Sequence, residues 1–141
     1  MKVSFEVPGI PRGKQRPRIV NAGGYVRAYT PEQTAIYENL VRIEYRQQCG
    51  PVKLTPPISA TITGVFPIPK STSRKKREQM IAGRILHTKK VDCDNLAKII
   101  LDSLNTIAYD DDSGISELNV RKVYGENPRV EITLEEMDEV P

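Results

Sequence analysis

The chain has 141 residues, of which 28% are charged and 38% hydrophobic, and its formal net charge at pH 7 is +3. This length suits one domain with its own hydrophobic core, so we expect a single domain over residues 1–141. No apolar run approaches the ~20 residues that cross a bilayer, and the N-terminus lacks a signal pattern, which predicts a cytoplasmic protein with no membrane partner. Cys49 and Cys93 are too few for a disulfide framework and lack the spacing of a zinc site.

The N-terminal part of the sequence predicts one strand and one long helix. Lys2–Pro8 alternates apolar and polar residues, as a half-buried strand does. Residues 9–29 are rich in proline, glycine and arginine, so no long regular structure is expected there, and Arg12, Lys14, Arg16 and Arg18 should project from a loop. Thr30–Gln48 opens with an N-cap threonine, a proline at the first helical position and an acidic first turn, which predicts a helix. Its expected core positions are Ile36, Tyr37, Leu40, Val41, Ile43 and Tyr45.

The rest of the sequence predicts three more strands and two more helices. Ile58–Phe66 alternates as a strand, and a short helix is expected at Ser73–Ala82. After a second long helix at Asp94–Ile107, Leu118–Tyr124 and Val130–Leu134 are expected to form an antiparallel pair. The order β-α-β-α-β-β, with the short helix in a loop, favours an α+β domain whose helices pack on one mixed sheet.

Charge is strongly segregated along the chain. Between Arg12 and Lys90 there are sixteen lysine and arginine residues and four acids, a local net charge of +12. Such a surface attracts polyanions. The only histidine, His87, lies in this region and is expected to be solvated. The expected nucleic-acid contacts form a first basic segment (Arg12, Lys14, Arg16 and Arg18) and a second one (Lys70, Arg74, Lys75, Lys76, Arg77, Lys89 and Lys90).

An acidic window follows at residues 92–112, where six aspartates accompany one basic residue, Lys98. The helix expected at Asp94–Ile107 has two distinct faces. One face is apolar (Leu96, Ile99, Ile100, Leu104 and Ile107), and the opposite face is polar (Asp94, Lys98, Asp102 and Asn105).

Each feature of the acidic window has an ordinary structural explanation. Lys98 could form helix-surface ion pairs with Asp94 and Asp102, which contribute ~0.3–0.5 kcal/mol each. Asp92 could be an N-cap, and residues 110–112 could form a turn. A calcium loop is excluded because Ile115 stands where glycine is required.

The combination of these acids nevertheless favours phosphodiester chemistry. Hydrolysis of a phosphodiester uses a hard divalent cation, held by several oxygens, that activates water and neutralises developing charge. Asp92 and Asp94 can converge at the start of the helix, and a loop past its end would supply a third acid. Lys98, one turn beyond Asp94, could reach the phosphate or the leaving oxygen.

Several longer motifs run through the sequence: Gly-Lys-Gln-Arg-Pro-Arg at 13–18, Tyr29-Thr30-Pro31, Thr88-Lys89-Lys90, Asp92-x-Asp94-Asn95-Leu96-x-Lys98, Leu101-Asp102-x-Leu104-Asn105 and Tyr109-x-Asp111-Asp112-Ser113. With these motifs the chain resembles, nearly end to end, the RusA-like Holliday junction resolvases of bacteriophages and prophages. The linked Asp-x-Asp-Asn-x-x-Lys and Asp-Asp-Ser motifs are the specific part of the resemblance.

The resemblance implies a homodimeric, magnesium-dependent endonuclease that binds four-way DNA junctions and makes paired symmetric nicks, with Mn²⁺ as the other possible cation. It implies that Asp92, Asp94 and Asp112 are the catalytic carboxylates and metal ligands and that Lys98 assists, with Asp111 as the alternate third ligand. Two residues depart from the family pattern. Cys93 stands where an apolar residue is usual, and Gly114 stands where glutamine is common.

Two other functions stay open at this point. The chain could be a catalytically idle DNA-binding module of the same fold, although the presence of every acid and of Lys98 argues against this. It could also be a related nuclease that prefers flaps or forks. For the dimer, Leu101 is a candidate interface residue because it lies toward the polar side of its helix, and burial under its own loop is the alternative.

Overall fold

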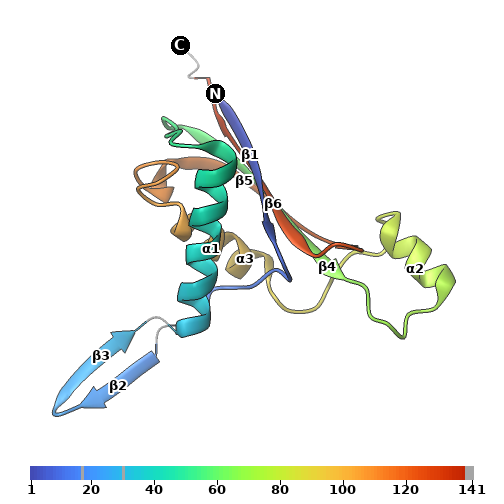
Figure 1. Ribbon diagram of the computed structural model, residues 1–141, viewed down its shortest axis with the longest axis horizontal. Helices are drawn as coiled ribbons and strands as arrows, with labels where there is room; N and C mark the ends of the chain where they lie inside the picture. The colour runs from blue at the N-terminus through green and yellow to red at the C-terminus, as the bar shows by residue number, and fades with distance from the viewer. Residues whose placement is uncertain (17, 30, 139–141) are drawn as a thin grey trace.

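The computed structural model describes residues 1–16, 18–29 and 31–138. The expected α+β fold and the order of its elements are confirmed, with one hairpin added near the N-terminus (Figure 1). In chain order the elements are β1 (Lys2–Pro8), β2 (Arg18–Ala22), β3 (Tyr25–Tyr29), α1 (Glu32–Cys49), β4 (Ile58–Pro67), α2 (Arg74–Ile81), α3 (Cys93–Ser103), a 3₁₀ turn (Asp112–Gly114), β5 (Ile115–Gly125) and β6 (Arg129–Glu136).

The central sheet has four strands in the order β1-β6-β4-β5. Strand β4 is parallel to β5 and antiparallel to β6, and β1 is antiparallel to β6, so the sheet is mixed as expected. Helices α1 and α3 lie on one face of the sheet, whereas α2 stands apart near one end of the strands (Figure 1). No helix among the described residues combines the length and the apolarity that crossing a membrane requires.

The expected pairing of the last two strands is wrong. Strand β4 lies between β5 and β6, pairing with β5 on one side and with β6 on the other. The short connection at residues 126–128 therefore spans the end of a strand instead of closing a hairpin. The alternation of both segments is real, but it fixes only which face of a strand is buried and not which strand lies beside it.

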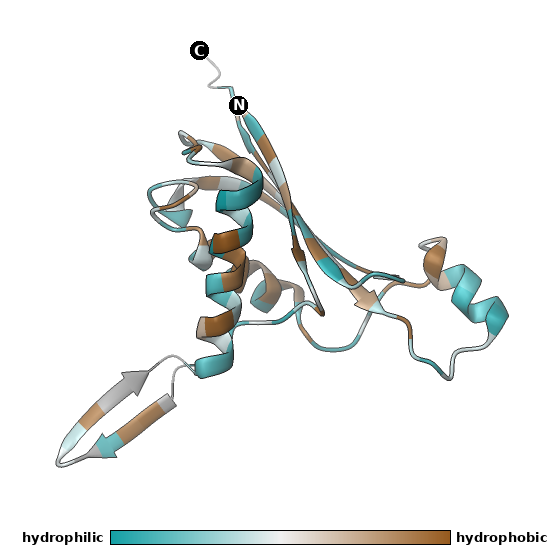
Figure 2. Cartoon of the chain, viewed as in Figure 1, coloured by the Kyte–Doolittle hydropathy of each residue, from teal (hydrophilic) through white to brown (hydrophobic). Residues whose placement is uncertain are grey.

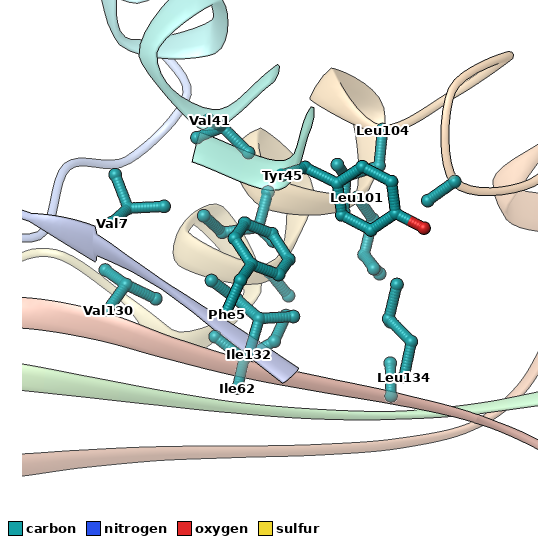
Figure 3. Packing of buried hydrophobic residues seen from close by; sticks show 14 of the residues in the cluster. Phe5, Val7, Val41, Tyr45, Ile62, Leu101, Leu104, Val130, Ile132 and Leu134 are labelled. Atoms are coloured by element: carbon teal, nitrogen blue, oxygen red, sulfur yellow. The ribbon is translucent and has the colours of Figure 1, made fainter. Parts of the chain in front are cut away.

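The core lies between the sheet and the two long helices (Figure 3). Strands contribute Phe5, Ile62 and Ile132, and the rings of Phe5 and Tyr45 of α1 form a T-shaped pair with 5.3 Å between centroids. Two expected core positions of α1 are wrong, because Ile36 is 62% exposed and Ile43 is 49% exposed. The helix buries the narrower stripe formed by Tyr37, Val41 and Tyr45.

Helix α3 buries the apolar face that its sequence predicts, but it ends at Ser103, earlier than expected. Leu104 is its C-cap, and Thr106 has a positive φ of 67°, a conformation that a helix cannot contain. The chain then folds back, and the hydroxyl of buried Tyr109 donates a 2.6 Å hydrogen bond to the carbonyl of Leu101. This return brings the last aspartates of the acidic window to the C-terminal end of α3.

The loop expected over residues 9–29 is present at Arg12, Lys14 and Arg16, but the expectation is wrong from Arg18 onward, where the short strands β2 and β3 form a hairpin that projects from the body (Figure 1). Its two-residue loop is Gly23-Gly24, and both glycines have positive φ, of 61° and 85°. This is the backbone of the tight turn that best matches the twist of two antiparallel strands. The hairpin carries exposed apolar residues, among them Ile19 and Val26 (Figure 2). The expected N-cap of α1, Thr30, lies outside the described residues.

Candidate active site

The first two candidate carboxylates lie at the N-terminal end of α3. Asp92 is the N-cap by backbone position, with an extended φ of −69° and ψ of 150°, but its side chain forms no capping hydrogen bond. Asp94 lies in the first turn, and both residues are exposed. Capping therefore does not explain the carboxylate of Asp92.

The expected ion pairs on the surface of α3 are not formed between the described residues Asp94, Lys98 and Asp102. Lys98 is exposed. The carboxylate of Asp102 instead accepts a 2.7 Å hydrogen bond from the ammonium of Lys14, which also lies 3.4 Å from Glu38. Asp94 and Lys98 thus share a solvent-facing side of the helix one turn apart, as the sequence predicts.

Lys14, one of the expected DNA contacts, is half-buried between these two acids. Burial lowers the pKa of its ammonium, but the hydrogen bond to Asp102 and the negative charges of Glu38 and Asp102 outweigh this effect and raise the pKa overall. Lys14 therefore stays charged, and its positive charge compensates the negative charges of Glu38 and Asp102.

The aspartates after α3 have different partners. Asp110 forms a 2.6 Å ion pair with Lys53. Asp111 caps the 3₁₀ turn, because its carboxylate accepts a hydrogen bond from the amide of Ser113 at 3.0 Å, and the contacts with Ser113 lower the pKa of Asp111. The ion pair with Lys53 accounts for the carboxylate of Asp110, and the cap of the 3₁₀ turn accounts for that of Asp111. Asp112 is left without such an explanation.

Asp112 is half-buried, and its backbone N–H donates a 2.8 Å hydrogen bond to Oδ1 of Asn105. Burial raises the pKa of its carboxyl, and a hydrogen bond with Asp102 and the negative charges of Asp102 and Asp111 raise it further. A cation would relieve the repulsion between Asp102 and Asp112. This environment distinguishes Asp112 from the exposed, capping Asp111.

The acids therefore form two pairs at opposite ends of α3. Asp94 and Asp102 are eight residues apart, which is about 12 Å along a helix axis, and Asp112 lies beside Asp102. Within the described part of the chain, no three His, Cys, Asp or Glu side chains are close enough to hold a metal ion. The donor chemistry fits a hard cation such as Mg²⁺, because every candidate ligand is a carboxylate oxygen.

Most of the expected DNA contacts are exposed. These are Arg12 and Arg16 in the first basic segment and Lys70, Arg74, Lys75, Lys76, Lys89 and Lys90 in the second. Arg77 is half-buried and lies 3.5 Å from Glu126, and Arg74 lies 3.7 Å from Glu78. The side chain of Arg18 is outside the described part of the structure. Only Val91 separates Lys89 and Lys90 from Asp92, the first residue of the first acid pair.

Comparison with known proteins gives a consistent result. A family described as Endodeoxyribonuclease RusA matches residues 8–135, which include the acidic window and both basic segments. The chain belongs to the RusA family. A curated relative, "Uncharacterized protein YqaN" of Bacillus subtilis (strain 168), is 34% identical over 137 residues, which cover 96% of each chain. Membership in the RusA family makes this chain an endodeoxyribonuclease by family and confirms the resemblance seen in the sequence.

The sequence does not predict the contacts of two residues near the candidate site of this RusA-family protein. His87, expected to be solvated, is only 9% exposed, and its ring stacks on Phe66 at 3.7 Å between centroids. The ammonium of Lys122 on β5 binds backbone carbonyls just before Asp92. The sequence does contain a signal for Lys122. It lies two residues from Val120 and from Tyr124, both half-buried, at a strand position where an apolar residue is expected.

Proposed function

We propose that this RusA-family protein is a Mg²⁺-dependent, structure-selective endodeoxyribonuclease that resolves Holliday junctions by paired symmetric nicks. One observation carries the proposal. Asp92 and Asp94 stand exposed at the start of α3, without the cap and ion-pair contacts that would explain them structurally, and only Val91 separates Asp92 from the exposed Lys89 and Lys90. Carboxylates can bind a metal ion, and a basic surface beside them can bind the DNA backbone, so this arrangement would place the metal ion next to a phosphate.

The proposed roles follow from position and chemistry. Asp92, Asp94 and Asp112 hold the cation, which would supply an activated water and neutralise charge on the phosphate when bound. Lys98 is exposed one turn after Asp94, and its ammonium stabilises negative charge on the phosphate or the leaving oxygen. Asp111 remains the alternate third ligand, and its use in capping the 3₁₀ turn favours Asp112.

The proposed enzyme is a homodimer, because paired nicks related by symmetry require two sites related by a two-fold axis. A dimer also offers a way to unite the two acid pairs, since α3 separates them within one chain. An antiparallel arrangement of two copies would bring the first pair of one copy to the second pair of the other. Leu101 is only 7% exposed in its own core, so the interface has to be formed by other residues.

The decisive experiment is incubation with end-labelled four-way junction, flap, fork and linear duplex, each with Mg²⁺, Mn²⁺ or EDTA. The proposal expects cation-dependent, paired nicks in the junction and little cutting of the duplex. The Asp94→Asn variant is the control for a contaminating nuclease. Preferential cutting of flaps or forks would show that the preferred substrate is a flap or fork and not the four-way junction. Tight junction binding without any cutting would show that the protein is an idle DNA-binding module.

A further inference from the structure

Lys122 occupies an unusual position for a lysine, on the face of the sheet that the helices cover. It lies on the edge strand β5, and its register partner on β4 is Gly64. The neighbouring pairs on the same face are Ile62 with Val120 and Phe66 with Tyr124. Its ammonium lies 5.9 Å from the centre of the Phe66 ring. A lysine in such a position needs polar partners for its head group.

The partners of Lys122 are backbone groups of one short segment, residues 87–91, which we call the strap. Its ammonium donates hydrogen bonds to the carbonyls of Lys89 at 2.6 Å and Val91 at 2.8 Å. The carbonyl of Lys122 accepts a hydrogen bond from the amide of His87 at 3.4 Å. A single residue of β5 therefore holds the strap at its start, its middle and its end.

Both ends of the strap are also packed against the body. At the start, the His87 ring stacks on Phe66. At the end, Val91 is covered so closely by Gly13 that a Cβ added to the glycine would lie 2.2 Å from a methyl carbon of Val91. The next residue is Asp92, whose carbonyl accepts the first hydrogen bond of α3, from the amide of Leu96 at 3.0 Å. The strap therefore fixes where α3 begins.

We propose that Lys122 is a positioning residue for the first acid pair, acting through the strap. By holding alternate carbonyls immediately before Asp92, its ammonium sets the position of Asp92 and Asp94 and directs the exposed side chains of Lys89 and Lys90 beside them. The inference rests on the proposed function, because it takes these acids as metal ligands. In this role the ammonium of Lys122 donates two of its three N–H groups to the two carbonyls, and Lys122 does not itself contact DNA or the cation.

The first test does not depend on activity. Lys89 and Lys90 are trypsin sites within the strap, so the rate of tryptic cleavage there reports how often the strap opens. Lys122→Met keeps the aliphatic length but removes the ammonium, and we expect several-fold faster cleavage after Lys89 and Lys90. Arg121→Met is the matched control, because it removes one positive charge from the next, exposed residue of the same strand. Lys122→Arg, which can still donate to both carbonyls, should restore resistance.

The second test measures nicking of a four-way junction in Mg²⁺. We expect Lys122→Met to lower kcat by about 10- to 100-fold, as small displacements of catalytic groups do, while the Kd for junction DNA in EDTA stays unchanged and Lys122→Arg recovers most of the rate. If Lys122→Met does not fold, Lys122→Gln, whose shorter amide cannot reach both carbonyls, replaces it.

Different failures have different meanings. If the wild-type protein nicks no branched DNA, the proposed function fails, while the trypsin comparison still tests the strap. Equal cleavage of Lys122→Met and Arg121→Met after Lys89 and Lys90 overturns the role of Lys122. A weaker Kd with unchanged kcat also overturns it, because Lys122 would then be a DNA contact. A loosened strap with unchanged kcat shows that the strap does not position the acids.

Discussion

The amide of Asp112 and the side-chain oxygen of Asn105 are joined by a 2.8 Å hydrogen bond. Asn105 lies just past the end of α3, so this bond ties the loop that carries the last acid to the end of the helix that carries the first ones. Asn105 belongs to the polar face that the sequence predicts for this helix, yet its role is local. Asn105 binds the backbone amide of Asp112, whereas the neighbouring aspartates contribute negative charge.

Replacing Asn105 by alanine should therefore lower the nicking rate strongly and the free energy of unfolding only slightly. The lost neutral hydrogen bond should lower the free energy of unfolding by about 0.5–1.5 kcal/mol. The nicking rate should fall by a larger factor than this loss of stability explains, because the side chain of residue 105 no longer binds the amide of Asp112. Urea denaturation and single-turnover nicking measure the two effects. Asn39→Ala, which removes an exposed Asn–Arg contact on α1, is the matched control and should leave the nicking rate unchanged.

Asparagine substitutions should separate the four candidate acids. Asp92→Asn, Asp94→Asn and Asp112→Asn should each abolish nicking and weaken Mg²⁺ binding while the circular dichroism spectrum stays unchanged, because each removes a ligand but keeps the shape. Asp111→Asn should keep most activity. The reverse result for the last two variants, an active Asp112→Asn and an inactive Asp111→Asn, would show that the third ligand is misassigned by one residue.

Mixing two inactive variants should restore activity if the acid pairs of two copies form each site. A dimer of one Asp94→Asn chain and one Asp112→Asn chain then has one intact site and one doubly defective site. We expect single nicks in place of paired cuts after the variants are unfolded and refolded together, measured on a supercoiled cruciform plasmid. The refolded mixture stays inactive if each site is built from a single chain, because both chains then lack a ligand.

DNA affinity should depend on the basic residues that have no acidic partner close by. Lys75→Ala with Lys76→Ala should lower the slope of log K against log salt by about 1.8, since each lost phosphate contact contributes ~0.9. Arg74 and Arg77 contribute less because they lie near acids. Salt titrations with junction DNA check this. Lys2→Ala with Arg46→Ala removes the same charge elsewhere, and an equal loss of slope in that control would leave α2 without a specific role.

Stability should depend on pH through His87. Burial lowers the pKa of its imidazole, and the positive charges of Lys122 and Lys89 lower it further. The unfolded chain, with a pKa of ~6.5, therefore binds a proton before the folded protein does. Stability should fall as the pH drops below ~6.5, by no more than ~1.4 kcal/mol per pH unit, and level off below the folded pKa. Urea denaturation at several pH values measures this, and His87→Phe should remove this component.

The fold was predictable where one short pattern decides it. The alternation of β1 and β4 and the apolar face of α3 predict the buried side of each element, and burial follows them closely. The neighbours of β5 and β6 were not predictable, because alternation says nothing about which strand pairs with which. The hairpin β2–β3 was missed for a different reason. Glycine in a segment rich in proline and arginine indicates a loop, although a glycine pair such as Gly23-Gly24 between two apolar segments also forms a hairpin turn.

The sequence predicts the exposed side of α3 that carries Asp94 and Lys98, but it does not predict the contacts around the candidate site. The spacing of Asp94, Lys98 and Asp102 predicts two ion pairs on one helix face. Lys14, which is distant in the sequence, binds Asp102 instead, and a tertiary contact of this kind leaves no periodic signal. Lys122 was missed because its partners are backbone carbonyls, which every residue has. Only the structure shows which carbonyls lie within its reach.

Cys93 gives the site a chemical reporter. The thiol is exposed and lies between Asp92 and Asp94, whereas the other cysteine, Cys49, is half-buried and its pKa is raised by burial. A maleimide should therefore label Cys93 first, without any engineered cysteine. Because the label would stand between two proposed ligands, the rate of alkylation should respond to cations and to DNA. The rate of thiol alkylation can thus report whether a cation or DNA is bound at the site, even in a variant that does not cleave DNA.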